Sequence, residues 1–217
     1  MRILITAGGT REYIDPVRFI SNASSGKMGF ALVRAALKAG HKVTIISASD
    51  LQPPVGIDFV GVDSAAQMFD TVKKHFPKCD CLIMAAAVAD YTPAQPAETK
   101  IKKQNKPLTI KLKPTTDILK WAGRHKELKS KKAKGKRQIV VGFALEDKNL
   151  QANAEKKLTG KNLDMIIANT PAAIGTEKST VQIKTPSQEW LKLSKVTKAT
   201  IAKKVISMIE AGLKHAN

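Results

Sequence analysis

Short apolar runs alternate with amphipathic segments along most of the chain, and their order predicts strands and helices in turn. Apolar runs typical of buried strands occupy residues 3–6, 43–47, 59–62, 81–87, 139–144, 163–168 and 190–193. Apolar residues recur at helical spacing over residues 28–39, 64–76, 150–158 and 201–213. Gly40 is expected to end the first of these helices in a left-handed conformation, and Ser64 to begin the second as its N-cap.

Strands that alternate with helices at this spacing predict the fold class. We expect an α/β protein with a Rossmann-like, doubly wound, mostly parallel sheet and helices on both faces. The chain is expected to form a single domain over residues 1–217. Right-handed crossovers would place the carboxyl ends of the strands, and any ligand, along one edge of the sheet.

The middle of the chain departs from this rhythm. Four prolines punctuate residues 92–116, at positions 93, 96, 107 and 114. Apolar and polar residues alternate over residues 108–113, which predicts a half-exposed strand or a protruding arm. The stretch KELKSKKAKGKR at 126–137 is interpreted as a loop insertion.

The net charge narrows the range of partners. The chain has 37 Lys and Arg against 18 Asp and Glu, which gives a formal net charge of +19. Such a surplus attracts nucleic acid, nucleotides or phosphorylated metabolites. The basic run at 126–137 is either solvated or a nucleic-acid contact, and its lack of interleaved aromatic residues weakens the second interpretation.

Cysteine usage and hydropathy indicate the compartment. The two cysteines, Cys79 and Cys81, would point to opposite faces of a strand and cannot easily form a disulfide. No apolar run approaches the ~18 residues of a spanning helix. The N-terminus lacks the features of a signal peptide. The sequence therefore predicts a cytoplasmic protein with reduced thiols and no membrane partner.

Two glycine-containing turns are candidates for phosphate binding. Gly8 and Gly9 follow the first strand, where backbone N–H groups can approach an anion, although a purely structural turn explains them equally well. Ser24, Ser25 and Gly26 stand before the first helix and would supply donors to a phosphate, unless they only cap that helix. Neither the dinucleotide fingerprint nor the phosphate-loop pattern is present.

Charged and amide side chains add further candidates. Asn22 could donate its amide to a developing oxyanion. Asp90 lies just past a central strand and could hold a phosphate-bound cation, the alternative being a turn or cap aspartate. Lys100 could contact a phosphate, and Lys157 and Lys161, four residues apart, could form a second phosphate contact or an exposed surface. Since no nucleophile is paired with a base, the inventory favours phosphate chemistry.

Six segments carry a resemblance to a known family. They are ITAGGTRE (5–12), DPVRFISNASSGKMG (15–29), AAAVADY (85–91), KIKK (100–103), VGFALE (141–146) and KNLDMIIAN (161–169). Together they resemble phosphopantothenoylcysteine synthetase, also called phosphopantothenate–cysteine ligase, from the first strand to about residue 169 and more loosely beyond. The SNASSGKMG form is similar to the bacterial, CTP-dependent branch.

The resemblance implies a ligase of coenzyme A biosynthesis that joins 4′-phosphopantothenate and L-cysteine through an acyl-cytidylate, with CTP as co-substrate and Mg²⁺ as cofactor. It implies that Asn22 and Lys100 are catalytic and that Asp90 holds the metal. It also implies a homodimer, with the segment after Tyr91 in the partner contact, and a separate decarboxylase, because the chain starts at the synthetase strand. The implied nucleotide site consists of Gly8, Gly9, Ser24, Ser25, Gly26, Met84, Ala85, Ala86, Asp90, Lys100, Thr116, Asp117, Ile118, Leu119, Phe143, Lys157 and Lys161.

The sequence departs from the family pattern at one position, and two other functions are alternatives to the ligase. The family's usual Pro-Asp-Ile is Thr116-Asp117-Ile118 here, so the loop at this point can differ in shape from that of the family. An NAD(P)-dependent Rossmann oxidoreductase is disfavoured by the missing glycine fingerprint and by Ser47-Ala48-Ser49 where its second strand would end in an acid. A basic nucleic-acid-binding protein agrees with the charge of +19 and would bind with a steep salt dependence.

Overall fold

The fold is built on one eight-stranded sheet. The computed structural model describes residues 1–132 and 138–214, with no side chains described for 127–132 and 213–214. The sheet order is β12-β11-β10-β9-β6-β1-β4-β5. Its parallel strands are β1 (Arg2–Ala7), β4 (Lys42–Ser47), β5 (Asp58–Gly61), β6 (Cys81–Met84), β9 (Ile139–Leu145) and β10 (Met165–Asn169), and its antiparallel strands are β11 (Lys178–Thr185) and β12 (Gln188–Thr197).

The parallel strands have the order of a doubly wound sheet. Numbered among themselves along the chain, they stand in the order 3-2-1-4-5-6, which is that of a dinucleotide-binding fold. The order reverses between β1 and β6, which pair in parallel from Ile3↔Cys81 to Thr6↔Met84. This reversal creates a crevice at the carboxyl ends of the two strands, where such sheets bind ligands.

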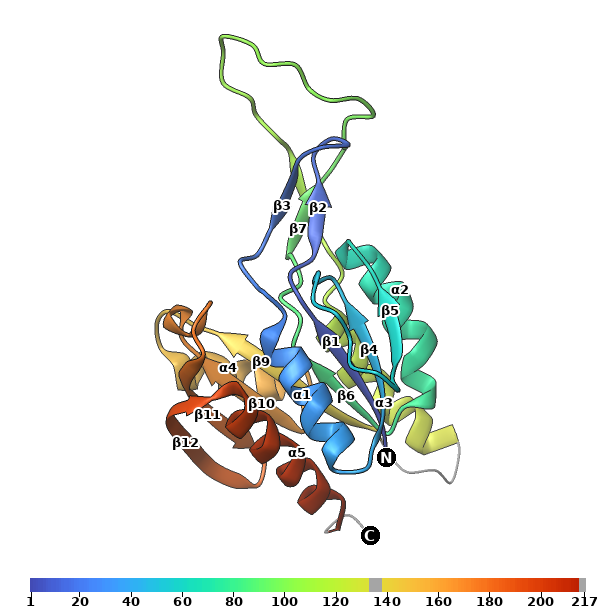
Figure 1. Cartoon of the computed structure of the whole chain (residues 1–217), viewed down its shortest axis with the longest axis vertical. Coiled ribbons are helices and arrows are strands. Elements are labelled where there is room, and N and C mark those ends of the chain that lie inside the picture. Colours follow the sequence, from blue (N-terminus) through green and yellow to red (C-terminus); the bar gives the residue numbers. More distant parts are fainter. Residues whose placement is uncertain (133–137, 215–217) are drawn as a thin grey trace.

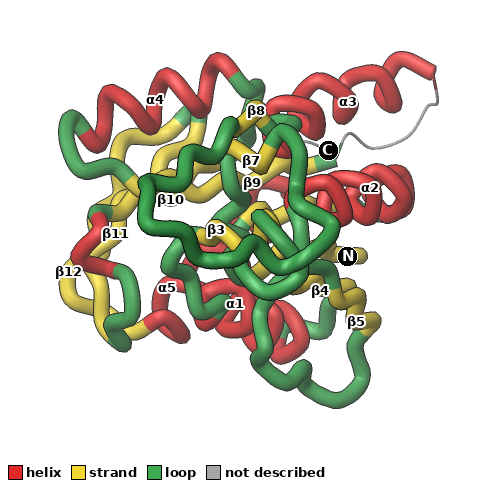
Figure 2. The backbone as a smooth tube through the Cα atoms, turned by 90° about the horizontal axis from the view of Figure 1, so that it is seen from above, coloured by secondary structure: helices red, strands yellow, loops and turns green. Residues whose placement is uncertain are grey.

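Helices cover both faces of the sheet (Figures 1 and 2). α1 (Lys27–Lys38) and α5 (Lys198–Lys214) pack side by side on one face. α2 (Ala65–His75), α3 (Ile118–Lys132) and α4 (Leu150–Gly160) cover the other, together with the short η1 (Phe76–Lys78), and η2 (Pro171–Ala173) follows β10. Each face has its own apolar core, one around Phe30 and Val205, the other around Met68 and Leu158. The predicted Rossmann-like α/β class is confirmed.

Local sequence signals explain where these helices begin and end. α1 stops before Gly40, which has a φ of +78° and so occupies the left-handed region predicted for it. α2 begins after Ser64, whose side chain accepts a hydrogen bond from the backbone N–H of Gln67, while the Gln67 side chain accepts one from the Ser64 N–H. All four residues of β6 are buried, as expected for a central strand covered on both faces.

An arm projects beyond the carboxyl edge of the sheet (Figure 1). It consists of the hairpin β2 (Arg11–Tyr13) and β3 (Phe19–Ser21), the pair β7 (Tyr91–Pro93) and β8 (Leu112–Pro114), and the loop between β7 and β8. Asp15 ties these parts together, because its buried carboxylate pairs with Arg18 and accepts a hydrogen bond from the N–H of Ile101 at 3.1 Å. The Arg18 guanidinium, against an opposing effect of burial, holds the pKa of Asp15 well below its usual range.

The alternating segment 108–113 lies on the arm, one of the two forms predicted for it, and its last two residues belong to β8. Two other local features were not predicted correctly. β11 was not predicted, and it joins the sheet antiparallel to β10. The basic run is helical up to Lys132 rather than a loop, and its remainder, 133–137, lies outside the described residues. Lys126 is buried and pairs with Asp164 at 2.9 Å, so the run starts inside the protein.

Within the described residues, no helix is both long and apolar enough to cross a bilayer.

Candidate active site

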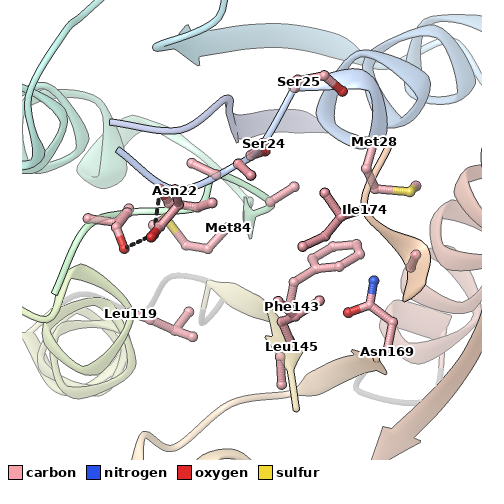
Figure 3. Close-up of a pocket in the computed structure, with 18 of the residues that line it drawn as sticks. Asn22, Ser24, Ser25, Met28, Met84, Leu119, Phe143, Leu145, Asn169 and Ile174 are labelled. Carbon is pink, nitrogen blue, oxygen red and sulfur yellow. Dashed lines mark hydrogen bonds between the residues drawn. The ribbon is translucent and has the colours of Figure 1, made fainter. Parts of the chain in front are cut away.

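A cavity of about 570 Å³ opens at the carboxyl ends of β6, β9 and β10, beside the switch point of the sheet. Figure 3 shows side chains from several elements turned into it, with Asn22 and Met84 at one side and Phe143, Asn169 and Ile174 at the other. The lining residues are Asn22–Met28, Met84–Val88, Asp90, Thr115–Leu119, Phe143–Leu145, Lys157, Lys161, Asn169, Ala173–Gly175, Ser179, Val181 and Lys198.

The loop before α1 forms one wall and needs glycine at its end. Gly26 has a φ of +76° and stands at the N-cap of α1. A Cβ there would lie 2.7 Å from the Cβ of Ser49, so a larger residue would be strained and crowded. The loop therefore runs close to the end of β4, and the first-turn N–H groups of α1 border the cavity.

Two buried threonines hold the wall formed by residues 85–90. Thr6 Oγ1 accepts a hydrogen bond from the N–H of Ala86 at 3.2 Å, and Thr10 Oγ1 accepts one from Ala89 at 2.9 Å. Gly9 and Ala87 add a parallel bridge between the same two segments. The threonines of ITAGGT thus position the AAAVAD segment at the cavity, a role that their place at the end of β1 did not reveal.

Asn22 is fixed by the backbone of that same segment. Its Nδ2 donates to the carbonyl oxygens of Ala87 at 3.3 Å and Val88 at 3.2 Å (Figure 3). Both amide hydrogens are therefore directed at the protein. Within the described part of the chain, Oδ1 accepts no hydrogen bond and is the atom free to meet a ligand.

Two paired lysines from α4 and its C-cap form the opposite, basic wall. Lys157 Nζ lies 2.5 Å from Oε1 of Glu146, and Lys161 Nζ lies 2.9 Å from Oδ2 of Asp117. Asn153 also donates to Glu146 at 3.1 Å, which holds the carboxylate in place. Burial opposes the ionised form of Asp117, but the hydrogen bonds from Lys161 and the N–H of Lys120 outweigh it and lower the pKa of Asp117.

An apolar floor lies between these walls. Met28, Met84, Phe143 and Ile174 turn into the cavity (Figure 3). Phe143 is half-buried on β9 and presents a ring against which a flat base can pack. Polar walls around an apolar floor suit a ligand that combines a base or acyl chain with phosphates.

The cavity brings together most of the residues predicted from the sequence. It is lined by Asn22, Ser24, Ser25, Gly26, Met84, Ala85, Ala86, Asp90, Thr116, Asp117, Ile118, Leu119, Phe143, Lys157 and Lys161. Gly8, Gly9 and Lys100 are not among its lining residues. A Cβ on Gly8 would lie 2.6 Å from the Ser49 nitrogen, and one on Gly9 would lie 2.5 Å from the Asn22 oxygen, so both glycines permit close contact between protein segments. Lys100 is exposed on the arm.

The far end of the cavity was not predicted from the sequence. Asn169 ends β10, Ile174 follows η2, Ser179 lies on β11 and Lys198 begins α5. Asn169 stood out only as the last residue of KNLDMIIAN, and no local motif marks the other three, which follow β10 and reach the cavity only through the tertiary fold. Glu146 stood out only as part of VGFALE, and it is separated from Lys157 by the loop before α4 and about two turns of that helix.

The carboxylates at the cavity are consistent with a magnesium ion held with a nucleotide. Asp90 and Asp117 both line it, and Mg²⁺ is usually held by one or two carboxylates together with phosphate oxygens and water. Over residues 1–132 and 138–214, no group of three or more His, Cys, Asp or Glu residues is arranged to hold a metal alone. A metal here would therefore depend on ligand phosphates.

The sheet order and this crevice define a Rossmann-like α/β protein of the kind that binds phosphorylated ligands at its switch point. A family model described as the C-terminal domain of the DNA/pantothenate metabolism flavoprotein (DFP) matches residues 1–213. The chain belongs to this family.

Individual relatives cover most of this chain. It is 46% identical over 175 residues to the coenzyme A biosynthesis bifunctional protein CoaBC of Bacillus subtilis, a match that covers 80% of this chain and 41% of that protein. It is 41% identical over 214 residues to a cysteine/cysteine sulfinic acid decarboxylase of an unknown prokaryotic organism, covering 96% and 57%. The chain thus spans about half the length of these curated relatives.

A solved structure is similar over nearly the whole fold. The crystal structure of the C-terminal domain of the coenzyme A biosynthesis bifunctional protein CoaBC matches with a TM-score of 0.82 and 37% identity. The match covers 99% of this chain and 96% of that one. The eight-stranded architecture is therefore that of a known domain of this family.

Proposed function

We propose that the chain is a phosphopantothenate–cysteine ligase of coenzyme A biosynthesis, which joins 4′-phosphopantothenate to L-cysteine at the expense of CTP. The observation that carries the proposal is the cavity at the switch point, with Asn22 on one wall and the paired lysines Lys157 and Lys161 on the other. Membership of the family and similarity to CoaBC proteins support it.

The first step activates a carboxylate. An oxygen of the 4′-phosphopantothenate carboxylate attacks the α-phosphorus of CTP, the bond to the β-phosphate oxygen breaks, and pyrophosphate leaves. Lys157 and Lys161 would neutralise charge on the nucleotide, and Phe143 would pack against the cytosine. When bound, Mg²⁺ would neutralise phosphate charge, and Asp90 is the residue proposed to hold it.

The second step forms the amide. The cysteine amine attacks the acyl carbon, the bond to the phosphate oxygen breaks, and CMP leaves. Asn22 is proposed to hold the acyl-cytidylate and the incoming amine. In the present geometry its Oδ1 can accept from the amine, whereas donation from Nδ2 to an oxyanion requires that it leave the carbonyls of Ala87 and Val88.

Lys100 stands on the arm rather than at the cavity of its own chain. For Lys100 to act as a catalytic residue on the nucleotide, either the arm must move or a second copy of the chain must supply the lysine. A second copy is also suggested by large apolar side chains exposed on the arm, namely Tyr13, Val17, Phe19, Ile20, Tyr91, Leu108 and Leu112. We therefore include a homodimer in the proposal.

The homodimer leads to a prediction about Phe19, whose ring is exposed beside Tyr13. We expect Phe19→Asp to convert the protein to a monomer in sedimentation velocity, because a carboxylate placed in an apolar contact loses its hydration. Phe59→Asp is the matched control, since Phe59 is similarly exposed on β5 and outside the arm. A dimer that survives Phe19→Asp but not Phe59→Asp would put the interface elsewhere.

The activity itself is tested by pyrophosphate release with 4′-phosphopantothenate, cysteine and Mg²⁺, comparing CTP with ATP. CTP-dependent release together with the ligated product supports the proposal. A preference for ATP keeps the reaction and rejects the choice of base. If folded protein releases no pyrophosphate with either nucleotide, the ligase proposal is wrong.

A further inference from the structure

A second basic region borders the cavity, from the face of the sheet opposite α4. Lys27 is the first residue of α1 and Lys198 the first residue of α5, and both line the cavity. These two helices pack against each other, and the first residue of each borders the crevice. The side chains come from positions 171 residues apart, and only the tertiary fold joins them.

The two lysines are close enough to affect each other. Burial lowers the pKa of Lys198, the positive charge of Lys27 lowers it further, and Glu177 acts in the opposite direction. Lys198 Nζ donates to the carbonyl oxygen of Thr176. In the described part of the chain, neither lysine forms an ion pair with a carboxylate. The pair thus presents incompletely balanced positive charge to the cavity.

Neutral donors surround this charge. Ser179 on β11 lines the same cavity as the lysines, and so does the amide of Asn169, which points into it (Figure 3). No acidic residue occupies the first turn of α1 or of α5, and the N-cap Gly26 has no side chain to satisfy the first N–H groups of α1. A doubly charged anion would pair with both ammonium groups and accept from these donors.

We propose that Lys27, Lys198 and Ser179 form a phosphate subsite at this end of the cavity. Its ligand is a phosphoryl group, carried either by the terminal phosphates of the nucleotide or by the phosphate of the acyl substrate. The identity of that ligand rests on the proposed function, but anion binding by the subsite does not. Lys198 is the residue chosen for the test. Lys27 belongs to the segment DPVRFISNASSGKMG, whereas Lys198 lies in α5, outside every motif found in the sequence.

The test measures binding of inorganic pyrophosphate by titration calorimetry at constant ionic strength. Hydrogen bonds to charged groups contribute about 1.5–3 kcal/mol, so Lys198→Met is expected to weaken binding roughly 10- to 100-fold. Lys198→Arg, which keeps the charge, should stay within about threefold of wild type. Lys203→Met is the matched control, because Lys203 is exposed on the same helix and does not line the cavity.

Two further pairs of titrations identify the source of the phosphate. If Lys198→Met weakens CTP but not CMP, the subsite takes the terminal phosphates of the nucleotide. If it weakens 4′-phosphopantothenate but not pantothenate, the subsite takes the substrate phosphate. Either pattern supports the subsite even if wild-type protein forms no ligated product, in which case only the ligase proposal fails.

Three results would overturn the subsite. The first is pyrophosphate affinity that does not change in Lys198→Met. The second is equal weakening of CMP, pantothenate and pyrophosphate, which would mean that Lys198 only ties down the loop at Thr176. The third is a wild-type protein that binds none of the phosphorylated ligands.

Discussion

Replacement of Asn22 by alanine is expected to lower kcat for ligation by about 10²–10³-fold, the usual effect of removing one polar group that stabilises an acyl-transfer transition state. Asn22 is held by two backbone carbonyls of the 85–90 segment, so its amide is already oriented before substrate binds. Oδ1 can accept from the incoming amine in this arrangement without reorganisation, and such preorganisation is what makes a single polar group effective. Because Asn22 is proposed to act in the second step, pyrophosphate release should exceed product formation in the variant.

The measurement is a rapid-quench comparison of pyrophosphate release and ligated product, with the KM for CTP determined alongside. Ser21→Ala is the matched control, since the neighbouring hydroxyl donates only to the Asn22 carbonyl at 3.3 Å and does not line the cavity. We expect this control to stay within about twofold of wild type, as is usual for a surface substitution. A kcat for Asn22→Ala within threefold of wild type would remove Asn22 from the mechanism.

Replacement of Gly123 by alanine is expected to destabilise the protein by about 3 kcal/mol, at the upper end of the cost of overpacking. A Cβ on Gly123 would lie 1.8 Å from the carbonyl oxygen of Lys161, which is backbone and cannot rotate away. The contact lies between α3 and the turn after α4, where Asn162 Nδ2 donates to the Gly123 carbonyl at 3.1 Å. For a chain of this length, such a loss corresponds to a decrease in Tm of roughly 6–12 °C.

The same substitution should also weaken CTP binding, because relief of the clash moves Lys161, whose side chain lines the cavity and pairs with Asp117. Thermal unfolding and CTP titration measure the two effects. Gly160→Ala is the control, because a Cβ added there would have no neighbour within 4 Å and alanine favours a helix. If Gly123→Ala unfolds at the temperature of Gly160→Ala or above, the close approach of α3 to this turn is wrong.

Local signals predicted the parallel part of the sheet well. β1, β4, β6, β9 and β10 are short apolar runs whose neighbours are helices of clear periodicity, so their pattern reflects burial on both faces. The edge pair β11 and β12 is half-exposed and pairs antiparallel, and β11 therefore carries too weak an apolar pattern to be recognised. The helical part of the basic run was missed for a related reason, since most of its side chains are lysines that show no apolar stripe.

The residues of the candidate site also fall into a predictable and an unpredictable group. Segments such as SNASSGKMG and AAAVADY stand next to strand ends, so the sequence places them at the ligand edge of the sheet. The distant residues that orient these segments could not be predicted from the sequence. Thr10 holds Ala89 from 79 residues away, and Glu146 fixes the ammonium group of Lys157.

By itself, the sequence determined the class of the fold, the family resemblance and half of the residues that line the cavity, because apolar periodicity and contiguous motifs are local properties of the chain. The tertiary structure alone decided that Gly8 and Gly9 serve contacts between protein segments, that Lys100 stands on the arm, and that Lys27 meets Lys198. Those facts depend on how strands pair and how helices pack across the sheet, and interactions between residues so distant in the chain leave no pattern in any one segment.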